Sequence, residues 1–206
     1  MDRRKNLILY MLMALLVVSA LAGHYLLSPW GFYRAADSRE AGLRMQLVDT
    51  ARSFLGAKEE DGSHRPIIDL YNSHEPLAVG YTVQYTDSWC STFASAAAIA
   101  GGFTDIIPTE CGCQRHIDLF KEMGCWEEDE RRIPQPGDLI FYDWEETTAG
   151  DSTGWSDHVG IVVGSKWPLL KVIEGNCDDQ VKERVIPVWD RTIRGYAKPD
   201  YHSRLR

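Results

Sequence analysis

The N-terminus constrains the fold most, because it removes one segment from the globular part of the chain. Arg3, Arg4 and Lys5 form a basic tip, and an uninterrupted apolar run follows from Leu7 to Val18. This arrangement is typical of a secretory signal or a membrane anchor, and a buried core helix is the alternative. Because the positive end stays in the cytosol, a signal or anchor leaves the bulk of the chain facing outward.

Two processing outcomes stay open for this segment. Ala20-Leu21-Ala22 fits a small-x-small cleavage pattern, which would release a chain that begins at Gly23. Extended to Leu27, the apolar segment instead approaches the roughly 20 residues that a spanning helix needs. Cleavage predicts a secreted protein, and retention predicts a protein anchored in the cell membrane.

Composition favours one domain after this segment. The 206 residues are 44% hydrophobic and 25% charged, which is ordinary for a globular chain and sufficient for one core. We expect residues 1–27 to be a signal peptide or membrane anchor, residues 28–38 a linker, and residues 39–206 the domain. The formal net charge of -8 argues against a nucleic-acid partner.

Two helices are predicted from periodicity and end signals. Apolar residues recur at helical spacing from Leu43 to Leu55, with Ser38 as a candidate N-cap and Gly56 as a stop. A second, alanine-rich helix begins near Cys90 and ends at Gly101-Gly102.

Cys90, in the first turn of the second helix, is a candidate nucleophile. Asp87 or Ser88 is expected to cap this helix. A free thiol titrates near pH ~8.5, and the positive end of a helix dipole favours the reactive thiolate. The alternative is that Cys90 is a small buried residue of the core.

A candidate base and its partner follow on strands. His158 begins an apolar strand that runs to Gly164, with Asp157 in front of it. The next strand, 171–176, follows at hairpin distance and carries Glu174 and Asn176. A Cys-His pair needs a third polar group to orient the imidazole, and either residue could serve.

These motifs together resemble the CHAP family, the cysteine, histidine-dependent amidohydrolases and peptidases of the papain-like superfamily. The resemblance covers roughly Leu43 to Tyr201. Its matching segments are Trp89-Cys90, Pro136–Phe141, Asp157–Val162, Ile173–Asn176, and Gly195-Tyr196 with Pro199.

The resemblance implies a papain-like α+β fold, with the nucleophile helix packed on a mostly antiparallel sheet. It further implies cleavage of amide bonds in bacterial peptidoglycan stem peptides, by an endopeptidase or an N-acetylmuramoyl-L-alanine amidase. Cys90 would be the nucleophile, His158 the base, Glu174 the group that orients the imidazole, and Asn176 an assisting group. This mechanism requires neither a metal nor an organic cofactor.

Substrate-binding residues are predicted less directly. Trp89 belongs to the nucleophile motif, and Gln84 or Tyr85 could complete an oxyanion hole with the Cys90 amide. Trp155 and Trp144 could line the groove, although core packing explains a tryptophan equally well. The loops 61–80 and 144–156 are candidates for substrate contact.

The other four cysteines allow several arrangements. An outward-facing chain permits disulfides, and a bond from Cys125 to Cys111 or Cys113 is our first expectation. Cys111 and Cys113 with His116 could instead form a metal site, although the spacing matches no strong zinc pattern. Cys177 could be a second free thiol near the active site.

Two other function classes remain open from the sequence. One is an inert module that binds wall peptides or a partner, with Cys90 buried or disulfide-bonded. The other is an amidase that acts on a small peptide conjugate, which the secretory start opposes. An outward-facing tethered enzyme suits remodelling of the cell's own wall, and the membrane is a partner if the N-terminal segment is retained.

Overall fold

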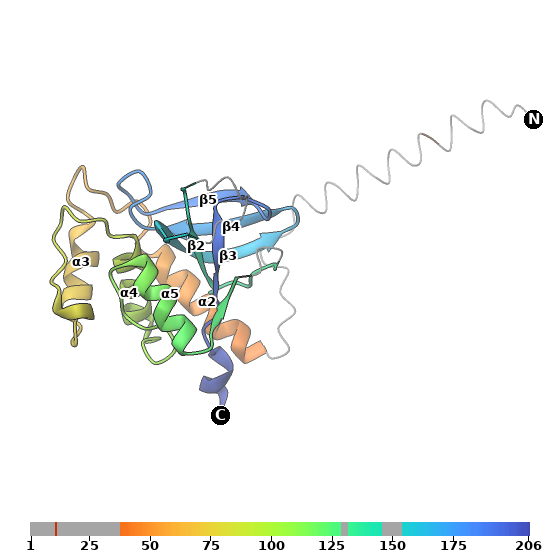
Figure 1. The fold of residues 1–206 in the computed structure, drawn as a ribbon, viewed down its shortest axis with the longest axis horizontal. Helices are drawn as coiled ribbons and strands as arrows, with labels where there is room; N and C mark the ends of the chain where they lie inside the picture. Colours follow the sequence, from red (N-terminus) through yellow and green to blue (C-terminus); the bar gives the residue numbers. More distant parts are fainter. Residues whose placement is uncertain (1–10, 12–37, 129–131, 146–153) are drawn as a thin grey trace, which may run out of the picture. The chain divides into compact units, whose positions relative to one another are not determined.

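The computed structural model describes residue 11 and residues 38–128, 132–145 and 154–206 (Figure 1). The expected signal or anchor segment and nearly all of the expected linker lie outside the described residues. Within the described part of the chain, no helix is both long and apolar enough to cross a bilayer.

Four α-helices and two short 3-10 helices are described. They are α2 (Ser38–Arg52), α3 (Arg65–Asn72), η1 (Ala78–Gly80), α4 (Cys90–Gly101), α5 (Cys113–Glu122) and η2 (Tyr201–Leu205). Helix α2 begins at the predicted Ser38 but ends at Arg52, and a series of turns continues to Gly56, which has a φ of 84°.

Helix α4 lies at the centre of the core and matches its predicted bounds. Small side chains let its neighbours approach closely, and Gly102 ends it in a left-handed conformation with a φ of 72°. The expected cap is wrong, because the N-cap is Trp89 and no side chain caps the helix. The Asp87 carboxylate instead accepts hydrogen bonds from the Gln84 backbone N–H and the Tyr81 hydroxyl.

The strands form one six-stranded antiparallel sheet in the order β1-β6-β2-β3-β4-β5. Their bounds are β1 (Trp126–Glu127), β2 (Leu139–Tyr142), β3 (His158–Lys166), β4 (Leu169–Glu174), β5 (Lys182–Pro187) and β6 (Ile193–Ala197). The described fold is therefore α+β, as predicted, and the expected hairpin of β3 with β4 is confirmed.

Alternation along the strands builds two cores. Leu139 and Phe141 of β2 pack with the helices, whereas Ile140 and Tyr142 belong to a second cluster with residues of β3 to β6. Figure 1 shows α2, α4 and α5 on the same side of the strands. Helix α4 packs on β3 and β4, which brings its first residue to the ends of these two strands.

Three segments differ from the sequence-based expectation. The candidate loop 61–80 contains α3, whose Ile67, Ile68 and Tyr71 are buried. Strand β4 ends at Glu174, so Asn176 lies in the turn beyond it with a φ of 53°. Strand β5 was not expected, and it brings Arg184 beside β4.

Candidate active site

The ends of three elements bring Cys90, His158 and Glu174 together. Cys90 is the first residue of α4, His158 is the first of β3, and Glu174 is the last of β4. Two glycines make this approach possible. A Cβ at Gly160 would lie 2.6 Å from Glu174 Cγ, and a Cβ at Gly175 would lie 2.3 Å from the Cβ of a phenylalanine on α4.

A buried ion pair links the base to its partner. His158 Nε2 lies 3.5 Å from Glu174 Oε2, and both side chains are almost completely buried. Since Nε2 faces the carboxylate, Nδ1 is the ring nitrogen left for the Cys90 thiol. The carboxylate therefore fixes the orientation of the ring, as the sequence predicts for Glu174.

Arg184 holds the same carboxylate from β5. Its Nε lies 2.5 Å from Glu174 Oε2 and its Nη2 lies 3.0 Å from Oε1, which is a bidentate arrangement. Burial alone raises the pKa of Glu174, but the hydrogen bonds and positive charges of His158 and Arg184 lower that pKa to about 2. Glu174 is therefore a carboxylate at neutral pH.

The thiol and the imidazole favour each other's charged form. Burial lowers the pKa of His158, but hydrogen bonds and charges from Cys90 and Glu174 outweigh it and raise the pKa to about 9. The pKa of Cys90 lies well below its usual value, first because of a hydrogen bond with Cys113 and then because of His158. Both shifts therefore favour the thiolate form of Cys90 and the imidazolium form of His158.

The start of α4 supplies backbone donors to this sulfur. The first N–H groups of a helix have no partner inside it, and the Ser91 N–H helps to lower the pKa of Cys90. The Cys90 and Ser91 amides thus lie where negative charge on sulfur, or on a substrate oxygen next to it, would be stabilised.

Cys113 is a neighbour of Cys90 that the sequence did not assign to the site. Its Sγ lies 3.4 Å from Cys90 Sγ, at the first residue of α5. The hydrogen bond with Cys90 and burial raise the pKa of Cys113 well above its usual value. The Cys113 S–H therefore donates to the Cys90 thiolate.

An aromatic side chain covers the base. The Trp144 ring stacks on His158 with centroids 5.0 Å apart and an angle of 26° between the planes. Trp144 is 53% exposed, so its outer face remains open to solvent. The sequence offered Trp144 as a possible groove residue, and the structure places it against the imidazole.

The four predicted substrate-binding residues lie in different surroundings. Trp89 is fully buried and its indole N–H donates to Glu59 Oε1, so its ring offers no surface to a substrate. The Gln84 side-chain amide donates to the Thr82 carbonyl, and the Tyr85 hydroxyl donates to an aspartate on α3. Trp155 is exposed.

Asn176, the predicted assisting residue, stands apart from the other three. It lies in the turn after β4, and the described contacts of His158 and Glu174 do not include it. Its neighbour Cys177 does reach the site. Burial, together with the charge and a hydrogen bond of Glu174, raises the pKa of Cys177 to about 11.

All five cysteines are free thiols in the structure. The expected bond of Cys125 to Cys111 or Cys113 is therefore not present. Cys113 instead contacts Cys90, and the Cys125 thiol donates to the Met123 carbonyl.

Metal ligation has one candidate cluster in the described part of the chain, and it is not the Cys111, Cys113 and His116 alternative. Ligand atoms of His158, Glu174 and Cys177 lie within 4.8 Å of one another. The Arg184 guanidinium already occupies the Glu174 carboxylate, and its positive charge opposes a cation there. His116 Nδ1 lies 3.0 Å from a serine hydroxyl, so the proposed Cys111, Cys113 and His116 site does not form.

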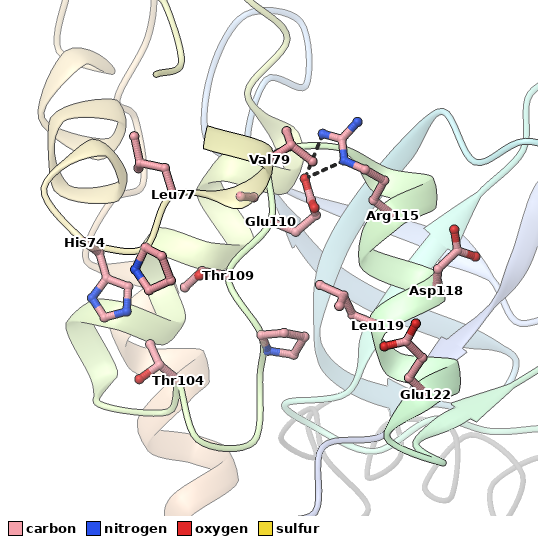
Figure 2. Close-up of a pocket in the computed structure, with 13 residues that line it drawn as sticks. His74, Leu77, Val79, Thr104, Thr109, Glu110, Arg115, Asp118, Leu119 and Glu122 are labelled. Atoms are coloured by element: carbon pink, nitrogen blue, oxygen red, sulfur yellow. Dashed lines mark hydrogen bonds and ion pairs between the residues drawn. The ribbon is translucent and has the colours of Figure 1, made fainter. Parts of the chain in front are cut away.

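Two pockets lie beside the start of α5. Figure 2 shows the larger, of about 670 Å³, with Arg115, Asp118, Leu119 and Glu122 along one wall and His74 and Leu77 along the other. The second, of about 530 Å³, is lined by residues close in sequence to Cys90 and Cys113, Ser88 and Gly112 among them. Arg115 lines both pockets and pairs with the buried Glu110 carboxylate at 2.8 Å.

Comparison with known proteins shows little. No family model matches the chain, and no curated protein matches it. The chain is similar to a solved structure described as "The crystal structure of Ly7917", with a TM-score of 0.44 and 12% identity over 77% of this chain. The chain spans 62% of that protein's length, and a likeness of this degree supports no inference about function.

Proposed function

We propose that the protein is a cysteine-dependent amide hydrolase. The observation that carries the proposal is the arrangement of a thiol at the start of a helix, a buried imidazole and a buried carboxylate. Cys90 lies beside His158, and His158 lies beside Glu174. A thiolate paired with an imidazolium is the reactive form of a cysteine nucleophile.

In this mechanism the Cys90 thiolate attacks the carbonyl carbon of an amide, and the helix-start amides stabilise the oxyanion. The His158 imidazolium then gives its proton to the leaving amine, which leaves a thioester on Cys90. A water molecule, deprotonated by His158, hydrolyses the thioester, which restores the Cys90 thiolate and the His158 imidazolium. Glu174 stabilises the imidazolium at each stage, and Arg184 keeps the carboxylate in place.

For the substrate, we propose the stem peptides of bacterial peptidoglycan, cleaved as an endopeptidase or as an N-acetylmuramoyl-L-alanine amidase. The segments that resemble the CHAP family, in family order, support this substrate and a papain-like assignment of the fold. The basic and apolar N-terminal segment supports an extracytoplasmic location, either secreted or anchored. The 530 Å³ pocket, lined by residues close in sequence to Cys90 and Cys113, is the candidate site for the peptide.

Digestion of crosslinked peptidoglycan by the purified full-length protein tests the proposal. Mass spectrometry of released fragments should show new amino groups between peptide residues for an endopeptidase, or free lactyl-linked glycan for an amidase. Cys90→Ala should abolish release, and Cys125→Ala, a thiol substitution away from the site, should retain it. Wild-type protein whose Cys90 is alkylated readily but which releases nothing from several wall chemotypes would instead support an inert binding module.

A further inference from the structure

The Cys113 thiol, at the start of α5, forms and breaks no bond in the proposed hydrolytic steps. Cys90 needs only His158 as its base, yet Cys113 Sγ lies 3.4 Å away. The other three thiols have different neighbours: Cys111 lies by Arg115, Cys125 by a backbone carbonyl, and Cys177 by Glu174. Among the described thiols, Cys90 and Cys113 are the pair in contact.

We propose that Cys113 is a resolving thiol, which forms a reversible disulfide with Cys90 after a hydroperoxide oxidises Cys90. The sulfur atoms need to close from 3.4 Å to about 2.05 Å, a movement that small side-chain rotations can supply. Both residues begin helices whose first turns face each other at this point.

The polarity of the pair fits the two steps of this chemistry. A thiolate is oxidised first, and the pKa of Cys90 is lowered while that of Cys113 is raised. Cys90 is therefore the sulfur that reacts with the oxidant, and Cys113 keeps its proton until the second step.

The balanced reaction consumes one hydroperoxide for each disulfide. The Cys90 thiolate attacks one oxygen of hydrogen peroxide, the O–O bond breaks, and the leaving hydroxide takes the His158 proton to become water. Cys113 sulfur then attacks the Cys90 sulfenic acid, an S–S bond replaces the S–O bond, and the thiol proton leaves with the hydroxide as a second water. Two thiols are oxidised and one peroxide is reduced to two waters.

Hydrogen peroxide suits the burial of the two sulfurs. Cys90 is 5% exposed and Cys113 is 8% exposed, so a small oxidant reaches them most easily. Hydrogen peroxide is nearly as small as water and can reach a sulfur that a water molecule must approach during hydrolysis. The disulfide removes the nucleophile, so the switching of activity rests on the proposed hydrolase function, although formation of the bond does not.

Peroxide treatment of the reduced full-length protein tests the proposal. After oxidation and unfolding in guanidinium chloride, which exposes every thiol, N-ethylmaleimide should label three of the five cysteines, and peptide mass spectrometry should find a bond between Cys90 and Cys113. Dithiothreitol should restore all five labels. Cys125→Ser is the matched control, because it should leave the new bond intact.

Cys113→Ser should convert the reversible product into sulfinic or sulfonic acid on Cys90, which dithiothreitol does not reduce. A wild-type protein that gains oxygen on Cys90 while Cys113 stays open to labelling would overturn the proposal, as would a bond between other cysteines or no reaction at all. This wild-type readout is decisive even if the serine variant does not fold. If the bond forms but neither redox state cleaves peptidoglycan, the hydrolase proposal fails and the thiol pair stands.

Discussion

Replacement of Glu174 by Gln should lower the pKa of His158, because the buried carboxylate supplies much of the charge that holds the proton. His158 is raised from an ordinary pKa of 6.5 to about 9 by Cys90 and Glu174, against the lowering effect of burial. The contributions of Cys90 and Glu174 must offset the lowering of the pKa by burial and also produce the net rise. If the two partners contribute equally, the contribution of Glu174 to the pKa therefore exceeds half of the net rise. We therefore expect the pKa to fall by more than about one pH unit, or at least ~1.4 kcal/mol.

Titration of the His158 Hε1 resonance by NMR measures this change directly, with the resonance assigned from the spectrum of His158→Gln. The matched control is Glu183→Gln on the same sheet, since Glu183 pairs with Lys171 and Arg52 and does not touch the imidazole. The reasoning is refuted if Glu174→Gln folds normally and the midpoint of His158 stays near that of the control.

The free energy of unfolding at alkaline pH is a poorer readout of the raised pKa of His158, because the lowered pKa of Cys90 acts against it. A raised pKa for His158 stabilises the fold below pH 6.5, and this contribution is lost as the pH rises through about 9. A lowered pKa for Cys90 acts in the opposite sense, since its contribution is fully present above 9.0 and is lost as the pH falls. Between 6.5 and 9 each state of the pair holds one proton, so the two effects cancel and the free energy of unfolding should be nearly flat.

Two further substitutions test the residues that support the site. Arg184→Met should lower the free energy of unfolding by about 2 to 4 kcal/mol in urea titrations, because the fully buried Glu174 loses its bidentate partner. Solvent access to Arg184 limits the cost. An Arg184→Met variant that unfolds like the wild type would contradict this reasoning. Gly175→Ala should destabilise by about 2 kcal/mol, or about 4 to 8 °C by calorimetry, because the new methyl would overlap Phe93. Gly42→Ala, where nothing lies within 4 Å, is the control, and equal effects of the two alanines would contradict the packing argument.

Local signals were sufficient to predict three side chains that lie together in the structure, Cys90, His158 and Glu174. Cys90 follows from an alanine-rich helix with clear ends, and His158 follows from the leading edge of an apolar strand. Glu174 follows from hairpin distance, because antiparallel neighbours in sequence are neighbours in the sheet. The prediction for Asn176 has no support from these contacts, because a turn with positive φ begins directly after Glu174 and takes the chain out of the strand.

Arg184 and Cys113 could not be predicted in the same way, because tertiary packing places both. Arg184 pairs with Val172 in the register of β4 with β5, so its long side chain reaches diagonally to Glu174, two residues along the same face. Strand β5 gave no clear signal of its own in the sequence. Cys113 reaches Cys90 only because the starts of α4 and α5 meet.

These two contacts change what the site can do. Without Arg184, the buried Glu174 carboxylate would lose a bidentate partner and a positive charge, and its pKa would rise. Without Cys113, the Cys90 thiolate would lose the hydrogen bond that does most to lower its pKa. The candidate reacting groups can therefore be predicted from the sequence, whereas their protonation states depend on side chains that only the assembled fold brings to them.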